Sequence, residues 1–259
     1  MQTLGDEESA ANVGKPFKPL PPPNIKEVFS RQTTINLIAY TALALHSITF
    51  DQLLPVFMYQ SLRSPQQEAD MRLPFKFAGG FGLQSESIGF LFMLYGLFGM
   101  LVQFLVFPPI AHRYGILKCF KVCAILFPIV YAITPFTSLV DGQRNKQIFA
   151  FILMMVKSVC IMFAFPCSTI LLTNSAVSLR ILGTVNGFAT SFAALGRGTG
   201  PAIGGNAFSF GVKHGYVGFA WWVLAFLAAV GIPPVWMLTE MHSCGSDSDS
   251  DEREEEQQL

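Results

Sequence analysis

Six apolar runs, each long enough to cross a lipid bilayer as a helix, constrain this chain more than any other feature. A bilayer core requires about 20 apolar residues in one α-helix. Charged residues are correspondingly scarce, at 13% of the chain. The runs occupy residues 33–58, 87–110, 115–137, 148–173, 182–207 and 216–238. The sequence therefore predicts an all-α, multi-pass membrane protein with six transmembrane helices.

Composition narrows the classes of partner and cofactor. The mean hydropathy of +0.45 identifies the lipid bilayer as the first expected partner, and either a plasma or a vacuolar membrane would suit it. A formal net charge of zero gives no reason to expect a nucleic acid. Cys119 and Cys123 lie one helical turn apart but lack His or carboxylate neighbours, so we expect neither a metal site nor a cofactor.

The two ends differ in composition from the apolar middle. Residues 1–32 are polar and proline-rich, which predicts an N-terminal segment without a cleaved signal peptide. Residues 33–238 form the predicted bundle, and residues 239–259 form an acidic tail expected to be disordered. Lys and Arg are more numerous on the side of the termini, which favours cytoplasmic ends. Trp221 and Trp222 near the start of the last run, and Trp236 near its end, are typical of residues at a membrane interface.

The fifth run contains unusually many glycines for a membrane helix. Gly196, Gly200 and Gly204 recur every four residues, so they stack on one helix face and allow close approach of a neighbour. Pro201 removes the backbone donor that would reach the carbonyl of Arg197, which predicts a bend there.

This glycine pattern resembles the antiporter motif of the major facilitator superfamily, found on the fifth helix of a six-helix half. The matching residues are Gly187, Gly196, Gly200, Pro201, Gly204 and Gly205. The loop between the second and third runs resembles the superfamily's basic loop through Arg113, Gly115 and Lys118. His112 stands where that loop has an aspartate.

Three further stretches, at residues 46–57, 73–82 and 171–191, resemble the C-terminal half of fungal drug:proton antiporters and zinc-induced-facilitator-like proteins. The resemblance implies one half of a twelve-helix fold, built from two inverted three-helix repeats. It also implies an N-terminal six-helix half as partner, on the same or a separate chain, with residues 1–32 resembling the linker between halves. A genuine half-transporter and a truncated product both fit.

Apart from Lys118 and Lys121 near the start of the third run, four His, Asp, Lys or Arg side chains lie within the apolar runs, where each is costly to bury. They are His46, Asp51, Lys157 and Arg197. Asp51 is the one acid well inside a run, so an ion pair with Lys157 or Arg197 is expected. A buried carboxylate beside a cation can exchange a proton as the conformation changes, and His46 could share that role.

Each of these residues also has a structural interpretation. Asp51 lies near the end of its run and could reach interfacial water. His46 could be a buried histidine whose hydrogen bonds are satisfied, and Arg197 could bind carbonyls freed near Pro201. Asn174, Asn186 and Thr190 are candidates for a substrate path, although Thr side chains often bond back to their own helix.

The favoured function is a secondary transporter, or half of one, that moves a small organic solute by alternating access coupled to protons. The alternative is a non-transporting assembly or regulatory subunit, or an inactive truncated product. An enzyme is not expected, because the chain lacks the Gly-x-Ser-Gly nucleophile motif of six-helix rhomboid proteases. A phosphate-binding Gly-x-x-x-x-Gly-Lys-Ser/Thr motif is also missing, which disfavours ATP-driven transport.

Overall fold

The computed structural model describes residues 28–175 and 179–239, and within these ranges the regular structure is helical. One isolated β-bridge joins Arg72 to Lys76. The elements are α3 (Arg31–Tyr59), α4 (Pro65–Ala69), α5 (Ser85–Leu101), η1 (Val102–Val106), α6 (Phe107–Tyr114), α7 (Ile116–Ile133), η2 (Thr134–Leu139), α8 (Gln143–Asn174), α9 (Leu179–His214), α10 (Phe219–Val230) and α11 (Ile232–Trp236).

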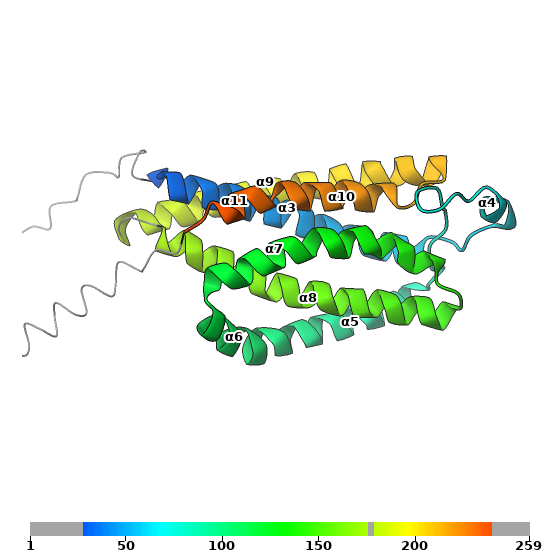
Figure 1. Cartoon of the computed structure of the whole chain (residues 1–259), viewed down its shortest axis with the longest axis horizontal. Coiled ribbons are helices and arrows are strands. Elements are labelled where there is room, and N and C mark those ends of the chain that lie inside the picture. Colours follow the sequence, from blue (N-terminus) through cyan, green and yellow to red (C-terminus); the bar gives the residue numbers. More distant parts are fainter. Residues whose placement is uncertain (1–27, 176–178, 240–259) are drawn as a thin grey trace, which may run out of the picture.

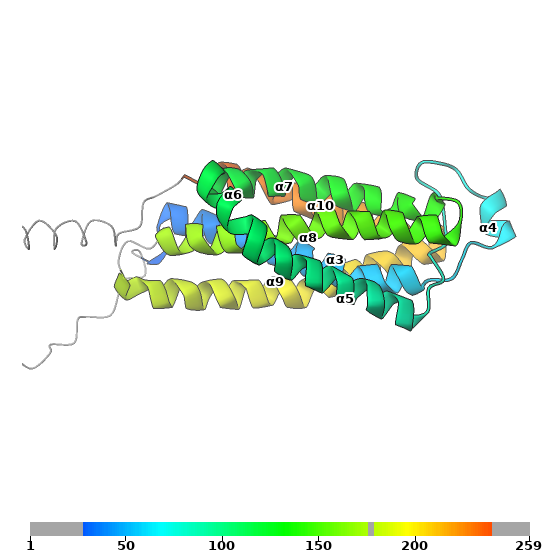
Figure 2. The same cartoon turned by 90° about the horizontal axis from the view of Figure 1, so that it is seen from below.

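The long helices run side by side along the long axis of the molecule, and successive ones alternate in direction (Figures 1 and 2). Helix α4 and its loops cap one end. The first and last described segments meet at the other end, where Gln32 Nε2 donates a hydrogen bond of 2.9 Å to the Thr239 carbonyl. The predicted N-terminal segment and acidic tail lie almost entirely outside the described residues.

Five helical stretches are long and apolar enough to cross a membrane: Arg31–Tyr59, Ser85–Tyr114, Ile116–Leu139, Gln143–Asn174 and Phe219–Trp236. Helix α9 is not among them, although it is 36 residues long. Its glycines, polar residues and Arg197 lower its hydropathy. The predicted multi-pass membrane protein is confirmed, with five of the six expected spans meeting this criterion.

Glycine and proline set the breaks between helices. Gly115 (φ 86°) and Gly142 (φ 82°) adopt left-handed conformations that favour glycine and separate α6 from α7 and η2 from α8. Pro108 and Pro109 lack the amides that would donate one turn back, and the preceding segment η1 is π-helical. By contrast, α9 continues through Pro201 without a break.

Helix α3 lies at the centre of the bundle and packs against α8, α9, α10 and α11. Its Phe50 ring stacks on Tyr131 of α7 with centroids 4.9 Å apart, and meets Trp221 of α10 edge-on at 5.4 Å. Trp221 is fully buried, so the expectation that it anchors at the interface is wrong. It fills the core because α10 turns this face toward α3, whereas Trp236 is 47% exposed.

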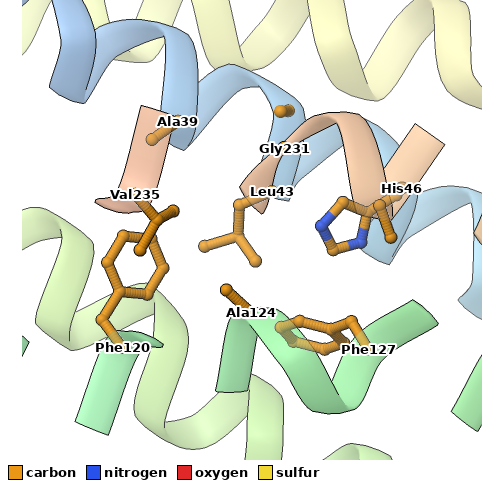
Figure 3. A pocket seen from close by; sticks show the side chains of 10 residues that line it. Ala39, Leu43, His46, Phe120, Ala124, Phe127, Gly231 and Val235 are labelled. Carbon is orange, nitrogen blue, oxygen red and sulfur yellow. The ribbon is translucent and has the colours of Figure 1, made fainter. Parts of the chain in front are cut away.

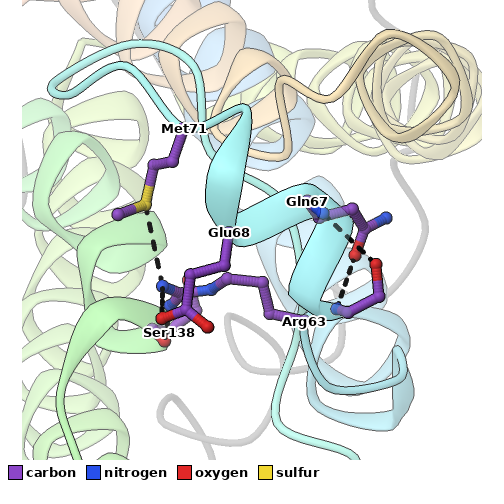
Figure 4. A network of polar contacts seen from close by, with 6 residues as sticks. Arg63, Gln67, Glu68, Met71 and Ser138 are labelled. Carbon is purple, nitrogen blue, oxygen red and sulfur yellow. Dashed lines mark hydrogen bonds and ion pairs between the residues drawn. The ribbon is translucent and has the colours of Figure 1, made fainter.

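The connection between α3 and α5 caps one end of the bundle (Figure 1), and polar contacts of its residues are drawn in Figure 4. Ser64 and Gln67 form a capping box that starts α4. Arg63 fastens the cap to the bundle: its Nη2 donates to the Ser138 carbonyl at 3.1 Å, and its Nη1 contacts the Met71 sulfur at 3.6 Å. Glu68 lies 4.0 Å from the Arg63 guanidinium, so the arginine bridges both parts.

Candidate functional site

A lysine–aspartate pair lies inside the bundle between α3 and α8. The Lys157 ammonium on α8 donates to the Asp51 carboxylate on α3 at 2.6 Å. The Lys157 side chain is completely buried, whereas the Asp51 side chain is 27% exposed. A buried ammonium requires such a partner, because an uncompensated charge in a low-dielectric interior is costly. The expected ion pair therefore forms with Lys157.

Tyr95 of α5 joins this pair, which the sequence analysis did not anticipate. Lys157 Nζ donates to the Tyr95 hydroxyl at 3.2 Å and also lies 5.3 Å from the centroid of the Phe50 ring. The ammonium of α8 is thus held by a carboxylate and an aromatic face from α3 and by a hydroxyl from α5. One signal was available: Tyr95 carries the one polar side chain in the apolar stretch 88–101.

His46 lies one helical turn before Phe50 on α3, beside the same aromatic cluster. Its Nδ1 is 3.0 Å from the Tyr131 hydroxyl, and its ring is 5.0 Å from that of Phe127. Since Phe50 stacks on Tyr131, one continuous series of side chains connects His46 to Lys157. His46 is 5% exposed and hydrogen-bonded, as its structural interpretation requires.

A small cavity separates α3, α7 and the α10–α11 segment, and His46 lies at its edge (Figure 3). Apart from the imidazole, the labelled side chains around it are apolar. It leaves about 10 Å³ for the centre of a water-sized sphere, so it could hold at most a single water. It is too small for an organic solute.

A larger open pocket of about 490 Å³ lies between α3 and α5. Pro55, one turn after Asp51, lines it on α3, and Phe92 lines it on α5. The Phe92 ring lies 6.0 Å from that of Tyr95, so the pocket adjoins the side chains that hold Lys157. Its volume is in the range of small-molecule sites.

The glycines of α9 fall on two different faces. A Cβ at Gly196 would lie 2.8 Å from the Thr41 carbonyl oxygen, and one at Gly200 would lie 2.7 Å from that of Leu45. Gly204 similarly faces the Thr49 side chain. These three glycines therefore let α9 approach the backbone of α3 closely, as their spacing predicts. Gly187 and Gly205 face open space instead, with nothing within 4 Å of an added Cβ.

The remaining predicted residues of α9 lie on its open surface. Arg197 is exposed, and Asp51 pairs with Lys157 rather than with it. Asn186 and Thr190 are exposed as well. The Thr190 hydroxyl donates to the Asn186 carbonyl at 2.9 Å, so it bonds back to its own helix. Asn174 is half-buried at the end of α8.

The residues of the basic loop lie at the junction of α6 and α7. Gly115 supplies the turn with its positive φ, and Arg113 lies over the ring of Tyr114, 5.6 Å from its centroid. Arg113 and Lys118 are exposed. Across residues 28–175 and 179–239, no group of three or more His, Cys, Asp or Glu side chains is arranged to bind a metal ion.

Comparison with known proteins places the sequence of this chain in a family. The chain is 37% identical over 212 residues, 82% of its length, to the major facilitator superfamily multidrug transporter mfsB of Aspergillus fumigatus. It is 30% identical over 179 residues, 63% of its length, to the major facilitator-type transporter psiT2 of Psilocybe cubensis. A probable peptide/nitrate transporter of Arabidopsis thaliana is 24% identical over 136 residues, 52% of the chain and 28% of that protein.

These matches cover 34% of the Aspergillus protein and 33% of the Psilocybe protein, so the chain spans about a third of the length of these relatives. No protein-family model and no solved structure matches the chain. The relatives are transporters rather than enzymes, in agreement with the sequence-based expectation. Together with the apolar helices, the similarity to these relatives shows that the chain is an integral membrane protein of the major facilitator superfamily.

Proposed function

We propose that this chain forms the C-terminal six-helix half of a major facilitator transporter, built from two inverted three-helix repeats. The support is twofold. Helix α9 lies alongside α3 within the bundle despite its lower hydropathy, as a sixth span would. The relatives are also about three times as long as the matched region, which leaves room in them for a second half.

We further propose that the protein moves a small organic solute by alternating access coupled to protons. The observation that carries this proposal is the fully buried Lys157 ammonium, held 2.6 Å from the Asp51 carboxylate. Ionisable residues inside membrane spans mark ion and substrate pathways in transporters. Asp51 has the exposure that proton exchange requires, since 27% of its side chain reaches the surface.

The pair supplies a simple switch. Protonation of Asp51 removes the negative charge, and the Lys157 ammonium loses its counter-ion in a dry environment. Conformations that bring water or another anion to Lys157 then become more favourable. Because the coupling between two sites is reciprocal, a solute that stabilises such a conformation also favours protonation of Asp51. A shift of Lys157 would also be felt by Phe50, which stacks on Tyr131 of α7, and by His46, which contacts the Tyr131 hydroxyl.

The solute would pass along the surface that this half presents to its partner. The pocket of about 490 Å³ between α3 and α5 adjoins the ion pair and suits a small organic molecule. Asn186, Thr190 and Arg197 on the exposed face of α9 would line the opposite part of the path. The name of the Aspergillus relative, a multidrug transporter, points to lipophilic organic compounds as the first solutes to test.

An N-terminal six-helix half would cover the exposed face of α9, where Gly187 and Gly205 leave room for close packing. Arg113, Gly115 and Lys118 would contact the cytoplasmic side of that half. The alternative is a non-transporting subunit or a truncated product. It is favoured by the hydrogen bonds of Lys157 and His46, which would stabilise the fold equally well without any transport.

The first experiment separates a half-protein from a longer one. An antibody against the acidic C-terminal sequence is used to immunoblot native membranes. A band near 28.5 kDa would indicate that this chain exists alone and must pair with another half. A band of about twice that mass, or more, would place the chain within a longer transporter. A protein of 28.5 kDa that purifies without any second half would contradict the two-half proposal.

Transport is then measured in inside-out vesicles that contain the protein and an imposed proton gradient. A lipophilic fluorescent cation such as ethidium is the test solute, and proton efflux is followed with a pH-sensitive dye. We expect Asp51→Asn to abolish solute-driven proton movement. Asp70→Asn, which removes an exposed carboxylate of a second lysine–aspartate pair, should leave it intact. Normal proton coupling in Asp51→Asn would exclude Asp51 as the proton carrier.

A further inference from the structure

A third pocket is lined by a different set of helices from the pocket beside the ion pair. It has a volume of about 470 Å³ and is bounded by η1, α6, α7 and α8. Its lining is almost entirely apolar and includes Ile110, Val122, Leu126, Val159 and Phe163. Val122 is 56% exposed, so the pocket opens on the outer surface of the bundle, toward lipid in a membrane.

Three thiols from two helices form part of the pocket wall. Cys119 and Cys123 of α7 and Cys160 of α8 all line it, and the Cys123 and Cys160 side chains lie within hydrogen-bonding distance of each other. Both are free cysteines. Cys123 is 6% exposed and Cys160 is 1% exposed, so a reagent must approach through the pocket.

The chemistry of this pair selects one class of ligand. A metal ion with three or more protein ligands does not fit, because the described residues offer no such group of side chains. The adjacent Cys123 and Cys160 thiols, which among the described residues belong to no metal-binding group of three or more ligands, suit a soft electrophile that can bond to both sulfurs at once. Apolar walls and an opening toward lipid require that the rest of this molecule be lipophilic.

We propose that Cys123 and Cys160 form a dithiol site for lipophilic trivalent arsenicals, such as aryl arsenoxides. The two S–H bonds break and two As–S bonds form. Both protons leave with the arsenoxide oxygen as one water molecule, and neither arsenic nor sulfur changes oxidation state. The aryl group occupies the apolar pocket. The resulting S–As–S bridge connects α7 to α8 covalently and restrains their relative motion.

This site is independent of the proposed transport function. Lys157 precedes Cys160 by three residues on α8, so a bridge there would also restrain the helix that carries the buried ammonium. Arsenical binding would then inhibit any activity that requires α8 to move. The thiol reaction itself needs no transport, so either proposal can fail without the other.

The test treats the purified chain in detergent with phenylarsine oxide and measures its intact mass. We expect one equivalent to add with loss of one water, and the adduct to be reversed by ethanedithiol but not by a monothiol. Cys123→Ser and Cys160→Ser should each reduce stable labelling at least tenfold, because a single As–S bond hydrolyses readily. Cys167→Ser is the matched control: this cysteine is also buried on α8 but does not line the pocket.

Thermal unfolding of each variant in the same detergent establishes that it is folded. Three results would overturn the proposal. The first is labelling of the wild type only after denaturation. The second is equal loss of labelling in Cys167→Ser. The third is loss in Cys119→Ser with retention in Cys160→Ser, which would assign the bridge to two cysteines of α7 rather than to the α7–α8 pair.

Discussion

The two sides of α3 hold their neighbours by different means. Toward α9, Gly196 and Gly200 let the two backbones approach closely. The carbonyl oxygens of Thr41 and Leu45 lie within 3 Å of where a Cβ on these glycines would be. Toward α8 and α5, Asp51 meets the Lys157 ammonium. The first side depends on shape, which does not respond to protons. The second depends on charge, which does, so the two sides should differ in what disrupts them.

The largest effect is expected at the ion pair and should be asymmetric. Asp51→Asn leaves a completely buried ammonium without its counter-ion, which costs about 3–5 kcal/mol of unfolding free energy. Lys157→Met leaves a carboxylate that is 27% exposed and can reach water, so its cost should be smaller. The measurement is unfolding of each variant in mixed detergent micelles.

The double variant Asp51→Asn/Lys157→Met sharpens this prediction, because it removes both charges together. We expect it to be more stable than Asp51→Asn alone, with a coupling energy of about 1–3 kcal/mol in the double-mutant cycle. Additive effects would show that the two side chains do not interact in the folded protein. A larger loss for Lys157→Met than for Asp51→Asn would show that the burial asymmetry is wrong.

The glycine side should give the next largest effect. Gly200→Ala places a Cβ 2.7 Å from the Leu45 carbonyl oxygen, and a backbone atom cannot rotate away. The overpacking should destabilise the protein by about 1–3 kcal/mol. Gly205→Ala is the matched control, because its Cβ meets nothing within 4 Å and alanine favours the helix by up to about 1 kcal/mol. Equal stability of the two variants would contradict the α3–α9 packing.

A smaller effect is expected from Tyr95→Phe, which removes one of the contacts of Lys157 and leaves the carboxylate in place. Loss of the 3.2 Å hydrogen bond should cost about 1 kcal/mol. The control is Tyr59→Phe on α3, since Tyr59 is 66% exposed. The Tyr95 effect should shrink in a Lys157→Met background. If it persists unchanged there, Tyr95 acts through packing alone.

The sequence predicted the helices and the types of residue in the site. It predicted less well which of these side chains contact one another. Apolar runs define spans because each must satisfy its backbone within lipid. One acid between two cations predicts an ion pair but leaves Lys157 and Arg197 as equal candidates. That choice depends on the rotation of α8 and α9 about their axes, which tertiary packing sets. For the same reason the spacing of Gly196, Gly200 and Gly204 predicted a closely packed face but did not identify α3 as the helix packed against it.

The exposed pair Asp70–Lys76 provides the last and smallest test, since it repeats the chemistry of Asp51–Lys157 at the end of the bundle. Lys76 Nζ donates to Asp70 at 2.9 Å, and this bond and charge hold the pKa of the Asp70 carboxyl below its usual value of 3.8. The pair therefore contributes stability above the unfolded-state pKa and loses it as the pH falls through the folded-state value. Solvent screens this interaction, so Asp70→Asn should barely change the unfolding midpoint at neutral pH. A carboxyl titration followed by NMR should return the Asp70 pKa toward its usual value in Lys76→Met. If Asp70→Asn destabilised the protein as much as Asp51→Asn, burial would not be what distinguishes the two pairs.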